Sequence, residues 1–255
     1  MIFDGTLPSR YQQFNKTQRI LFRLATHRVA EFVVVHEDLA HWLHEEIKVV
    51  QPVTIIPCLI APLPDALTKR LSTGLNDALV RYLSAEKRIC SIGAFVPTYG
   101  FKDVAQAVDE LRTDTGLALE LLLVAGRFAQ DDRYREEVLN GRDWITVLED
   151  VSNDDVFPIL KSSDVFVRGN VEEGYGISRV EAIWCGVPVV ATNVGETRGM
   201  LTYEFGDIGS LKAQLRLVLF EGKPDDVSAA SAMFHQEAER NLEDLKRVLG
   251  LTNEQ

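Results

Sequence analysis

Residues 164–192 read DVFVRGNVEEGYGISRVEAIWCGVPVVAT, and this stretch decides the fold. It opens with the apolar run 164–168 and closes with the apolar run 188–192, and a helical pattern lies between them at 177–185. Runs that are apolar throughout, rather than alternating, indicate strands buried on both faces of a sheet. Strand, helix and strand in this order predict a right-handed βαβ unit with parallel strands.

The same alternation continues on both sides of this stretch. Further strands are predicted at 31–36, 53–57, 88–93, 119–126 and 145–148. Further helices are predicted at 38–46, 65–85, 103–112, 131–139 and 154–162. We therefore expect an α/β protein with a Rossmann-like, doubly wound parallel sheet and flanking terminal helices.

The two ends of the chain differ from its centre. The N-terminal part has an arginine-rich helical pattern at 19–29, and the proline-bearing segment 56–66 (IPCLIAPLPDA) is typical of an extended connector. From Ser210 to Leu249 the charged pattern predicts two terminal helices. The predicted parts are 1–60 (an N-terminal remnant and connector), 61–220 (the Rossmann-like domain) and 221–255 (a C-terminal helix).

The amino-acid composition indicates a globular protein and argues against some kinds of partner. Apolar residues make up 46% of the 255 residues, which is ample for a buried core. The net charge of −11 argues against a broad basic face for nucleic acid or anionic lipid. The three cysteines are widely spaced and suit a reducing compartment. With no signal-peptide pattern and no apolar run long enough for a membrane span, we expect a cytoplasmic protein, and attachment to a membrane through a partner stays an open alternative.

The most informative candidate site is the segment from Glu173 to Glu181. Its two carboxylates have seven residues between them, and a Gly-Tyr-Gly turn follows the first. Glycine permits positive φ and close approach of a ligand to the backbone, and the following helix offers N–H groups to a phosphate. Carboxylates that bind hydroxyls beside such a phosphate seat indicate a nucleotide-sugar site. The alternative is a solvated acidic loop and a surface glutamate.

Three loops are predicted at the carboxyl ends of strands, where open α/β sheets bind ligands. They are residues 93–100, 125–128 and 173–176. Four cations lie near these ends and could face a phosphate or solvent: Lys102, Arg127, Arg168 and Arg198.

No metal or nucleophilic triad is expected. His36, His41, His44 and Glu45 lie close together in the sequence, but their spacing matches no metal-ligand motif. An exposed amphipathic helix explains these residues better, and no Walker-type lysine loop is present.

The segment 164–192 resembles the donor-site signature of retaining glycosyltransferases of family 4, in the GT-B superfamily. The matching positions are Asp164, Glu173, Gly174, Gly176, Glu181, Ala182, Gly186, Pro188, Val189 and Val190. Residues 89–111 (ICSIGAFVPTYGFKDVAQAVDEL) resemble the opening strand and glycine loop of that family, and 55–60 (IIPCLI) resembles its inter-domain connector.

The resemblance implies transfer of a sugar from a nucleotide-diphosphate sugar to a glycan or lipid-linked acceptor, with retention and without an obligatory metal or cofactor. Glu173 is the implied catalytic residue beside the donor sugar, and Glu181 is expected to bind the ribose. The donor-binding residues also include Gly93, Tyr175, Gly176, Ile177, Arg127 and Lys102, with backbone amides of the glycine turn around the diphosphate.

Two departures from the family pattern are visible. Ala94 and Tyr99 stand where the family usually has an arginine and a lysine that bind the diphosphate. A GT-B enzyme also has two Rossmann-like domains, and residues 1–60 are too few for a second one, so we expect either a partner chain or a longer parent chain to supply it. The rival interpretations are a non-catalytic nucleotide-sugar-binding subunit and, less well matched by the glutamate pair, a nucleotide-sugar epimerase.

Overall fold

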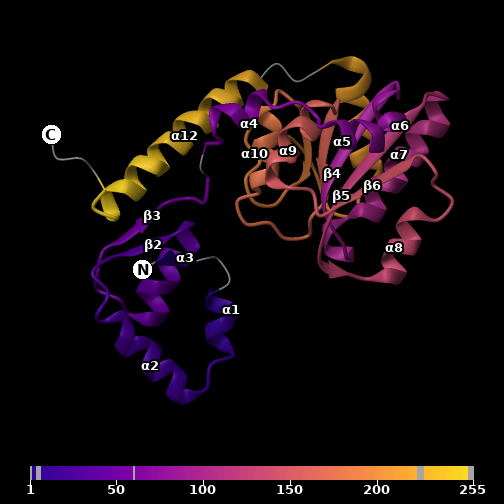
Figure 1. Ribbon diagram of the computed structural model, residues 1–255. Helices are drawn as coiled ribbons and strands as arrows, with labels where there is room; N and C mark the ends of the chain where they lie inside the picture. The colour runs from indigo at the N-terminus through magenta and orange to yellow at the C-terminus, as the bar shows by residue number, and fades with distance from the viewer. Residues whose placement is uncertain (1, 4–6, 60, 223–226, 252–255) are drawn as a thin grey trace. The chain divides into compact units, whose positions relative to one another are not determined.

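The computed structural model describes residues 2–3, 7–59, 61–222 and 227–251, which form two compact units (Figure 1). The smaller unit comprises Met1–Ala61 together with His235–Gln255. The larger unit is Pro62–Phe234 and contains the segment that decided the fold.

The larger unit is built on a six-stranded parallel sheet with the order β6-β5-β4-β7-β8-β9. This confirms the predicted doubly wound α/β sheet. Its strands are β4 (Lys87–Phe95), β5 (Leu119–Gln130), β6 (Ile145–Glu149), β7 (Val165–Arg168), β8 (Val189–Thr192) and β9 (Leu201–Tyr203). The chain starts in the middle with β4, adds β5 and β6 on one side, and then adds β7, β8 and β9 on the other. The strand order therefore reverses between β4 and β7, where such sheets form a ligand crevice.

Helices cover both faces of this sheet, with α9 and α10 on one side and α7 and α8 on the other in Figure 1. The core between sheet and helices includes Phe101, Val108, Leu121, Val167 and Leu215, all fully buried. Each such side chain stabilises the fold by roughly 1.5–3 kcal/mol. The helices are α7 (Phe101–Thr115), α8 (Asp132–Leu139), α9 (Asn153–Lys161), α10 (Ile177–Trp184) and α11 (Ile208–Arg216), which continues as the π-helical turn η3 (Leu217–Glu221).

The prediction was wrong about the ends of β4 and β5. β4 continues to Phe95 and β5 to Gln130, and these two residues pair after a shift in register that begins at Gly93. The shift accommodates extra residues in β5, so 125–128 is strand rather than a loop. Buried Phe95, whose ring lies 5.3 Å from that of Phe101, anchors the extension.

The predicted helix at 65–85 is interrupted. It consists of α4 (Pro64–Thr68), α5 (Thr73–Ala78) and α6 (Val80–Leu83). The backbone becomes extended at Lys69, and the Ser72 side chain then accepts the Leu75 N–H at 3.3 Å. This N-cap starts a new helix, because capping serines compete with continuation of the helix before them.

The smaller unit has a three-stranded parallel sheet of β1 (Ile2–Phe3), β2 (Phe32–Val34) and β3 (Val53–Ile55). The predicted strands at 31–36 and 53–57 are confirmed as β2 and β3, which are shorter than expected, whereas β1 and β9 were not predicted. Helices α1 (Leu7–Gln12), α2 (Lys16–Thr26) and α3 (Glu37–Trp42) accompany this sheet, with the π-helical turn η1 (Leu43–Ile47). His36 caps α3 by accepting the Leu39 N–H at 3.2 Å.

The predicted terminal helices are confirmed as α11 and α12 (Val227–Val248). The boundary between the two units falls within α12, and its later part belongs to the smaller unit. There, Asn241 donates from Nδ2 to the Leu59 carbonyl at 3.0 Å.

Candidate functional site

The loops after β4 and β7 meet where the strand order reverses. The Val171 amide donates to the Thr98 carbonyl at 2.9 Å. Gly100 has φ +69°, and a Cβ at this position would collide with the Gly169 carbonyl oxygen. Only glycine allows both this conformation and this approach. The two loops therefore form a continuous backbone surface at the carboxyl edge of the sheet.

A cavity of about 360 Å³ opens at these two loops. Its volume lies within the range of small-molecule sites. It is lined by Thr98, Tyr99, Arg168, Asn170, Val171, Glu172 and Glu173.

Glu173 is held in this cavity by two donors. Its Oε2 accepts from Arg168 Nε at 2.7 Å and from Asn170 Nδ2 at 3.2 Å. The Arg168 and Glu173 side chains are each only 12% exposed. The second carboxylate oxygen, Oε1, has no hydrogen-bond donor among the described residues, so it can accept from a hydroxyl of a ligand.

Arg168 is the one basic side chain among the described residues that line the cavity. It ends β7, donates from Nη1 to the Ile92 carbonyl, and carries its guanidinium 5.1 Å from the centroid of the Tyr99 ring. Contacts to a carboxylate, a carbonyl and an aromatic face together fix the plane of the guanidinium.

Asn170 adds an unsatisfied acceptor to the cavity wall. It is 5% exposed, and its Oδ1 has no hydrogen-bond partner among the described residues. Its backbone carbonyl accepts from the Thr192 hydroxyl at 2.7 Å, which keeps the residue in place. A buried polar atom without a partner costs stability, and such atoms are typical of binding sites.

Arg179 is a fully buried cation behind the glutamate loop. Its guanidinium donates to the Val194 carbonyl, to the Glu196 carbonyl at 3.1 Å and to Thr192 Oγ1 at 3.3 Å. Burial lowers its pKa to about 10, against the opposing attraction of Glu173. Arg179 therefore ties the chain after β8 to the start of α10 and positions the loop from behind.

The start of α10 faces the same carboxyl edge. Gly176 precedes the helix with φ +81°, and a Cβ there would lie 3.0 Å from Arg179 Cδ and 3.2 Å from Glu173 Cγ. The first N–H groups of a helix lack intrahelical partners and attract anions. Tyr175 and Ile177, whose amides were predicted to bind a diphosphate, flank this glycine, and Ile177 is 42% exposed.

Glu181 lies one helical turn after Ile177, on the same open face of α10. It is half-buried, and its carboxylate makes no hydrogen bond or ion pair with the described residues. Burial alone raises the pKa of this carboxyl above its ordinary value. An ionisable group with a perturbed pKa beside a crevice is a functional-site candidate.

The predicted Gly93 loop begins later than expected. Gly93 and fully buried Ala94 lie inside β4, and the turn comes after Phe95. Gly93 is needed because the Tyr99 ring packs where its Cβ would stand. The backbone of Arg127 lies in β5, and its side chain is outside the described residues.

Two other predicted cations have partners away from the cavity. Lys102 Nζ pairs with Glu137 on α8 at 2.7 Å. Arg198 forms an ion pair with Glu196 and lies 5.3 Å from the Phe234 ring centroid. The structure thus gives both side chains protein partners and brings Arg168, rather than either of them, to Glu173.

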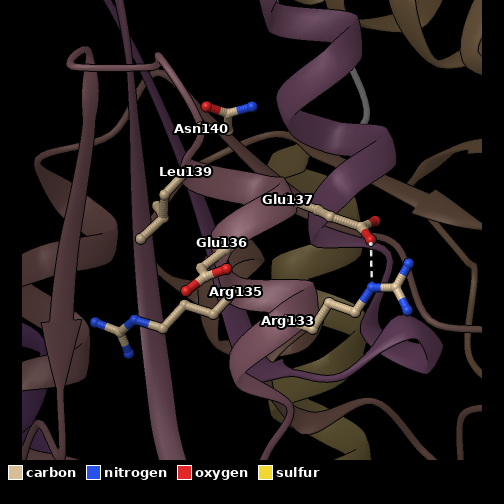
Figure 2. A pocket seen from close by; sticks show the side chains of 6 residues that line it. All are labelled: Arg133, Arg135, Glu136, Glu137, Leu139 and Asn140. Carbon is tan, nitrogen blue, oxygen red and sulfur yellow. Dashed lines mark ion pairs between the residues drawn. The ribbon is translucent and has the colours of Figure 1, made fainter.

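A larger hollow of about 660 Å³ runs along α8 (Figure 2). A single helix and the residue after it supply its lining, from Arg133 to Asn140. Three of its four charged side chains form ion pairs with described residues: Glu137 with Arg133 at 3.4 Å, and Arg135 with Glu149. We favour the smaller cavity as the site, because ligand sites need groups that converge from several elements.

The sequence did not reveal the roles of Arg179 and Asn170. Arg179 sits inside an apolar helical pattern, and nothing local shows that its partners come from the chain after β8. Asp164, part of the matching motif, instead pairs with Arg88 at 3.0 Å at the amino end of β7, and it stabilises the sheet.

The chain belongs to the glycosyl transferases group 1 family, which matches residues 86–219, more than half of its length. It is 31% identical over 143 residues to the O-antigen chain mannosyltransferase B of Escherichia coli, which covers 55% of this chain and 34% of that protein. It is also 31% identical over 153 residues to a trehalose synthase of Pyrococcus horikoshii, with coverage of 55% and 36%. The chain spans about a third of the length of these relatives.

Solved structures agree on the fold. A glycosyltransferase from Rickettsia africae matches with a TM-score of 0.69 at 15% identity, over 92% of this chain and 68% of that one. Sucrose-phosphate synthase from Thermosynechococcus elongatus matches with a TM-score of 0.62 at 19% identity, over 99% and 68%. Together with the family match, these similarities identify a GT-B-type glycosyltransferase fold.

Proposed function

We propose that this chain binds a nucleotide-diphosphate sugar and provides the donor side of a retaining sugar transfer, of the family 4 kind, to a glycan or lipid-linked acceptor. The observation that carries the proposal is the cavity between β4 and β7, where Arg168, Asn170 and Glu173 meet in front of α10. A cation, an unsatisfied acceptor and a carboxylate beside a helix start suit a ligand with both phosphates and hydroxyls.

Each group has a distinct task in this proposal. The N–H groups at the start of α10 bind the diphosphate, and Glu181 binds the ribose hydroxyls one turn further along the helix. Glu173, through its free Oε1, binds hydroxyls of the donor sugar and acts beside the reacting carbon. No step needs a metal, because the helix start and Arg168 supply positive charge.

Arg168 supports the proposal because its positive charge can replace part of the charge that two missing cations would supply. The family usually places an arginine and a lysine near the departing diphosphate, where this chain has Ala94 and Tyr99. The guanidinium of Arg168 lies 5.1 Å from the ring of Tyr99 itself. Neutralising the leaving diphosphate is the main electrostatic task of the transition state, so a cation close to the vacated position can take over part of it.

Calorimetric titration with UDP, GDP and their sugars tests the donor site. We expect Glu181→Gln to weaken nucleotide binding about tenfold to a hundredfold, because hydrogen bonds to a charged acceptor contribute roughly 1.5–3 kcal/mol. Glu136→Gln is the matched control, since this exposed glutamate lines the hollow along α8. If Glu136→Gln weakens binding and Glu181→Gln does not, the donor site is on α8 and our assignment is wrong.

A non-catalytic nucleotide-sugar-binding subunit remains the second candidate, favoured by Ala94, which is fully buried and offers no charge to the cavity. Transfer and donor hydrolysis should be measured with a candidate partner chain that supplies an acceptor domain. Product that retains the anomeric configuration and disappears in Glu173→Gln supports the transferase. Tight donor binding with neither transfer nor hydrolysis supports the binding subunit.

A further inference from the structure

Helix α2 in the smaller unit presents apolar side chains to solvent. Ile20, Leu21 and Leu24 are 52%, 60% and 59% exposed. Their spacing of one, three and four residues makes them neighbours on one helix face. The opposite face is the one that packs, since the Phe22 ring lies 5.4 Å from that of Tyr11. The helix therefore has one apolar face buried in its own unit and a second one uncovered.

Basic residues extend this uncovered face at both ends. Lys16 lies one turn before Ile20, and Arg28 follows Leu24 at the same spacing; both side chains are exposed. Lys16, Ile20 and Leu24 thus follow one line of the helix with Leu21 beside it, and Arg28 lies in the turn just after the helix ends at Thr26. Apolar side chains between basic ones are typical of helices that lie in a membrane interface.

The charge around α2 is opposite to that of the whole chain. The net charge is −11, yet residues 5–30 contain no aspartate or glutamate. The five cations of this segment are Arg10, Lys16, Arg19, Arg23 and Arg28. This local excess of positive charge is not apparent from the net charge of the whole chain.

No carboxylate among the described residues pairs with these cations. Arg19 donates to the Phe14 carbonyl at 3.0 Å and the Gln12 carbonyl at 2.8 Å, and Arg23 donates to the Tyr11 hydroxyl at 3.2 Å and the Glu46 carbonyl at 3.0 Å. Neutral acceptors hold the side chains without cancelling their charge. The segment therefore keeps a positive field that attracts an anionic surface.

We propose that α2 binds the surface of an anionic lipid bilayer, with Ile20, Leu21 and Leu24 inserted at the headgroup level and the basic residues on the phosphates. Among the described residues, no helix is long and apolar enough to cross a membrane. The acidic remainder of the chain favours one orientation, because it is repelled by the surface that attracts α2. This attachment is independent of the donor site, which lies in the other unit.

Vesicle flotation with the full chain tests the proposal. We expect the wild type to float with phosphatidylcholine vesicles that contain phosphatidylglycerol, to bind pure phosphatidylcholine at least tenfold less, and to be released by molar salt, which shortens the screening length to about 3 Å. The double variant Leu21→Asn/Leu24→Asn should lower the partition coefficient more than tenfold, because two exposed apolar side chains lose their insertion. Lys16→Glu should lower it about thirtyfold, since it changes two charges that contribute about 1 kcal/mol each.

Matched variants in the larger unit distinguish binding by this face of α2 from nonspecific binding by exposed apolar or basic side chains. Leu63→Asn/Val80→Asn removes two apolar side chains that are 78% and 64% exposed, and Arg70→Glu makes the same charge change in the larger unit. Both should float like the wild type. Equal binding to neutral vesicles, failure to bind anionic vesicles, or equal loss in the controls would overturn the proposal. Nucleotide titration of Lys16→Glu should match the wild type, which keeps this test separate from that of the donor site.

Discussion

At the scale of single residues, Glu181 places a carboxylate in a half-buried position, where its charged form lowers the stability of the fold. Burial raises its pKa, so the folded chain holds the proton more tightly than the unfolded chain does. The protonated Glu181 side chain therefore contributes fully to the free energy of unfolding below the ordinary pKa of a glutamate. This contribution is lost as the pH rises through the raised pKa. At neutral pH the ionised carboxylate destabilises the fold, which is common where a charge serves binding.

Glu181→Gln should consequently raise the melting temperature at pH 7. Each 1 kcal/mol gained corresponds to a shift of about 2–4 °C in a protein of this size. The difference from wild type should shrink toward zero as the pH falls below about 4, where both side chains are neutral. Melting curves across this range, with exposed Glu136→Gln as the control, check the sign. A variant that melts lower than wild type at pH 7 contradicts the argument.

Arg168 combines a structural and a proposed electrostatic task. Arg168→Gln leaves the Glu173 carboxylate without its cation in a largely buried site, so we expect a loss of about 2–4 kcal/mol in the free energy of unfolding. Diphosphate affinity should fall at least tenfold, and Arg168→Lys should restore part of it, because it keeps the charge but not the planar fork. Denaturant unfolding and calorimetry separate the two effects.

The control for this variant is Arg88→Gln, at the opposite end of the sheet. Arg88 and Asp164 form an ion pair with side chains 30% and 32% exposed, remote from the cavity. This variant should lose stability but retain nucleotide affinity. If both arginine variants lose affinity in proportion to stability, Arg168 is only structural.

The sequence pointed to those site residues that are marked by their immediate neighbours in the chain. Glu173 and Glu181 were selected as candidates because glycines and an apolar helix surround them within a few positions, although their roles stay predictions. Arg179 could not be identified, since its partners are carbonyls of Val194 and Glu196 that only folding brings near. Asp164 matched the motif, yet its pairing with Arg88, 76 positions earlier in the chain, was invisible for the same reason.

At the scale of elements, the start of α10 depends on a glycine with two constraints. Gly176→Ala forces a side chain into φ +81° and brings Cβ within 3.2 Å of Glu173. The backbone strain alone costs roughly 1–2 kcal/mol. We expect that loss in the free energy of unfolding, together with a loss of nucleotide affinity, because the glutamate loop must move.

Gly116→Ala provides the comparison for this element. Gly116 has φ +68°, and a Cβ there meets nothing within 4 Å. It should show the same loss of stability with unchanged nucleotide affinity. Equal affinity in both variants, measured by titration with UDP or GDP, would show that α10 does not start at the ligand.

Elements were predictable where periodicity was long and continuous, as in β4 and α7. The interruption of the predicted helix 65–85 could not be predicted, because the capping Ser72 is a single polar residue within an otherwise helical pattern. The extension of β5 to Gln130 also escaped prediction. It follows from the pairing of Gln130 with Phe95, and glycine at position 126 had suggested a turn.

At the scale of the whole molecule, strand and helix alternation predicted the doubly wound sheet, but not its order. The order follows from which strand returns beside β4, a long-range choice that a single sequence does not encode locally. In the smaller unit, β2 and β3 fall within the predicted strands 31–36 and 53–57, and only the two-residue β1 was missed. The uncovered face of α2 was hidden as well, because an apolar residue that faces solvent reads as core in the sequence.

The division into two units makes a prediction about where a nucleotide acts. Ligand at a hundred times its dissociation constant stabilises the bound state by about 2.7 kcal/mol, which slows exchange through site opening roughly a hundredfold. Because the candidate site lies within Pro62–Phe234, amide hydrogen exchange should slow in 96–100, 169–177 and α10 on addition of UDP or GDP. Residues 7–59 should be unchanged, and Glu181→Gln at the same ligand concentration should lose most of the protection. Protection centred on α8 or within 7–59 would instead place the nucleotide outside the crevice between β4 and β7, and the roles assigned to Arg168, Glu173 and Glu181 would then have to be withdrawn together.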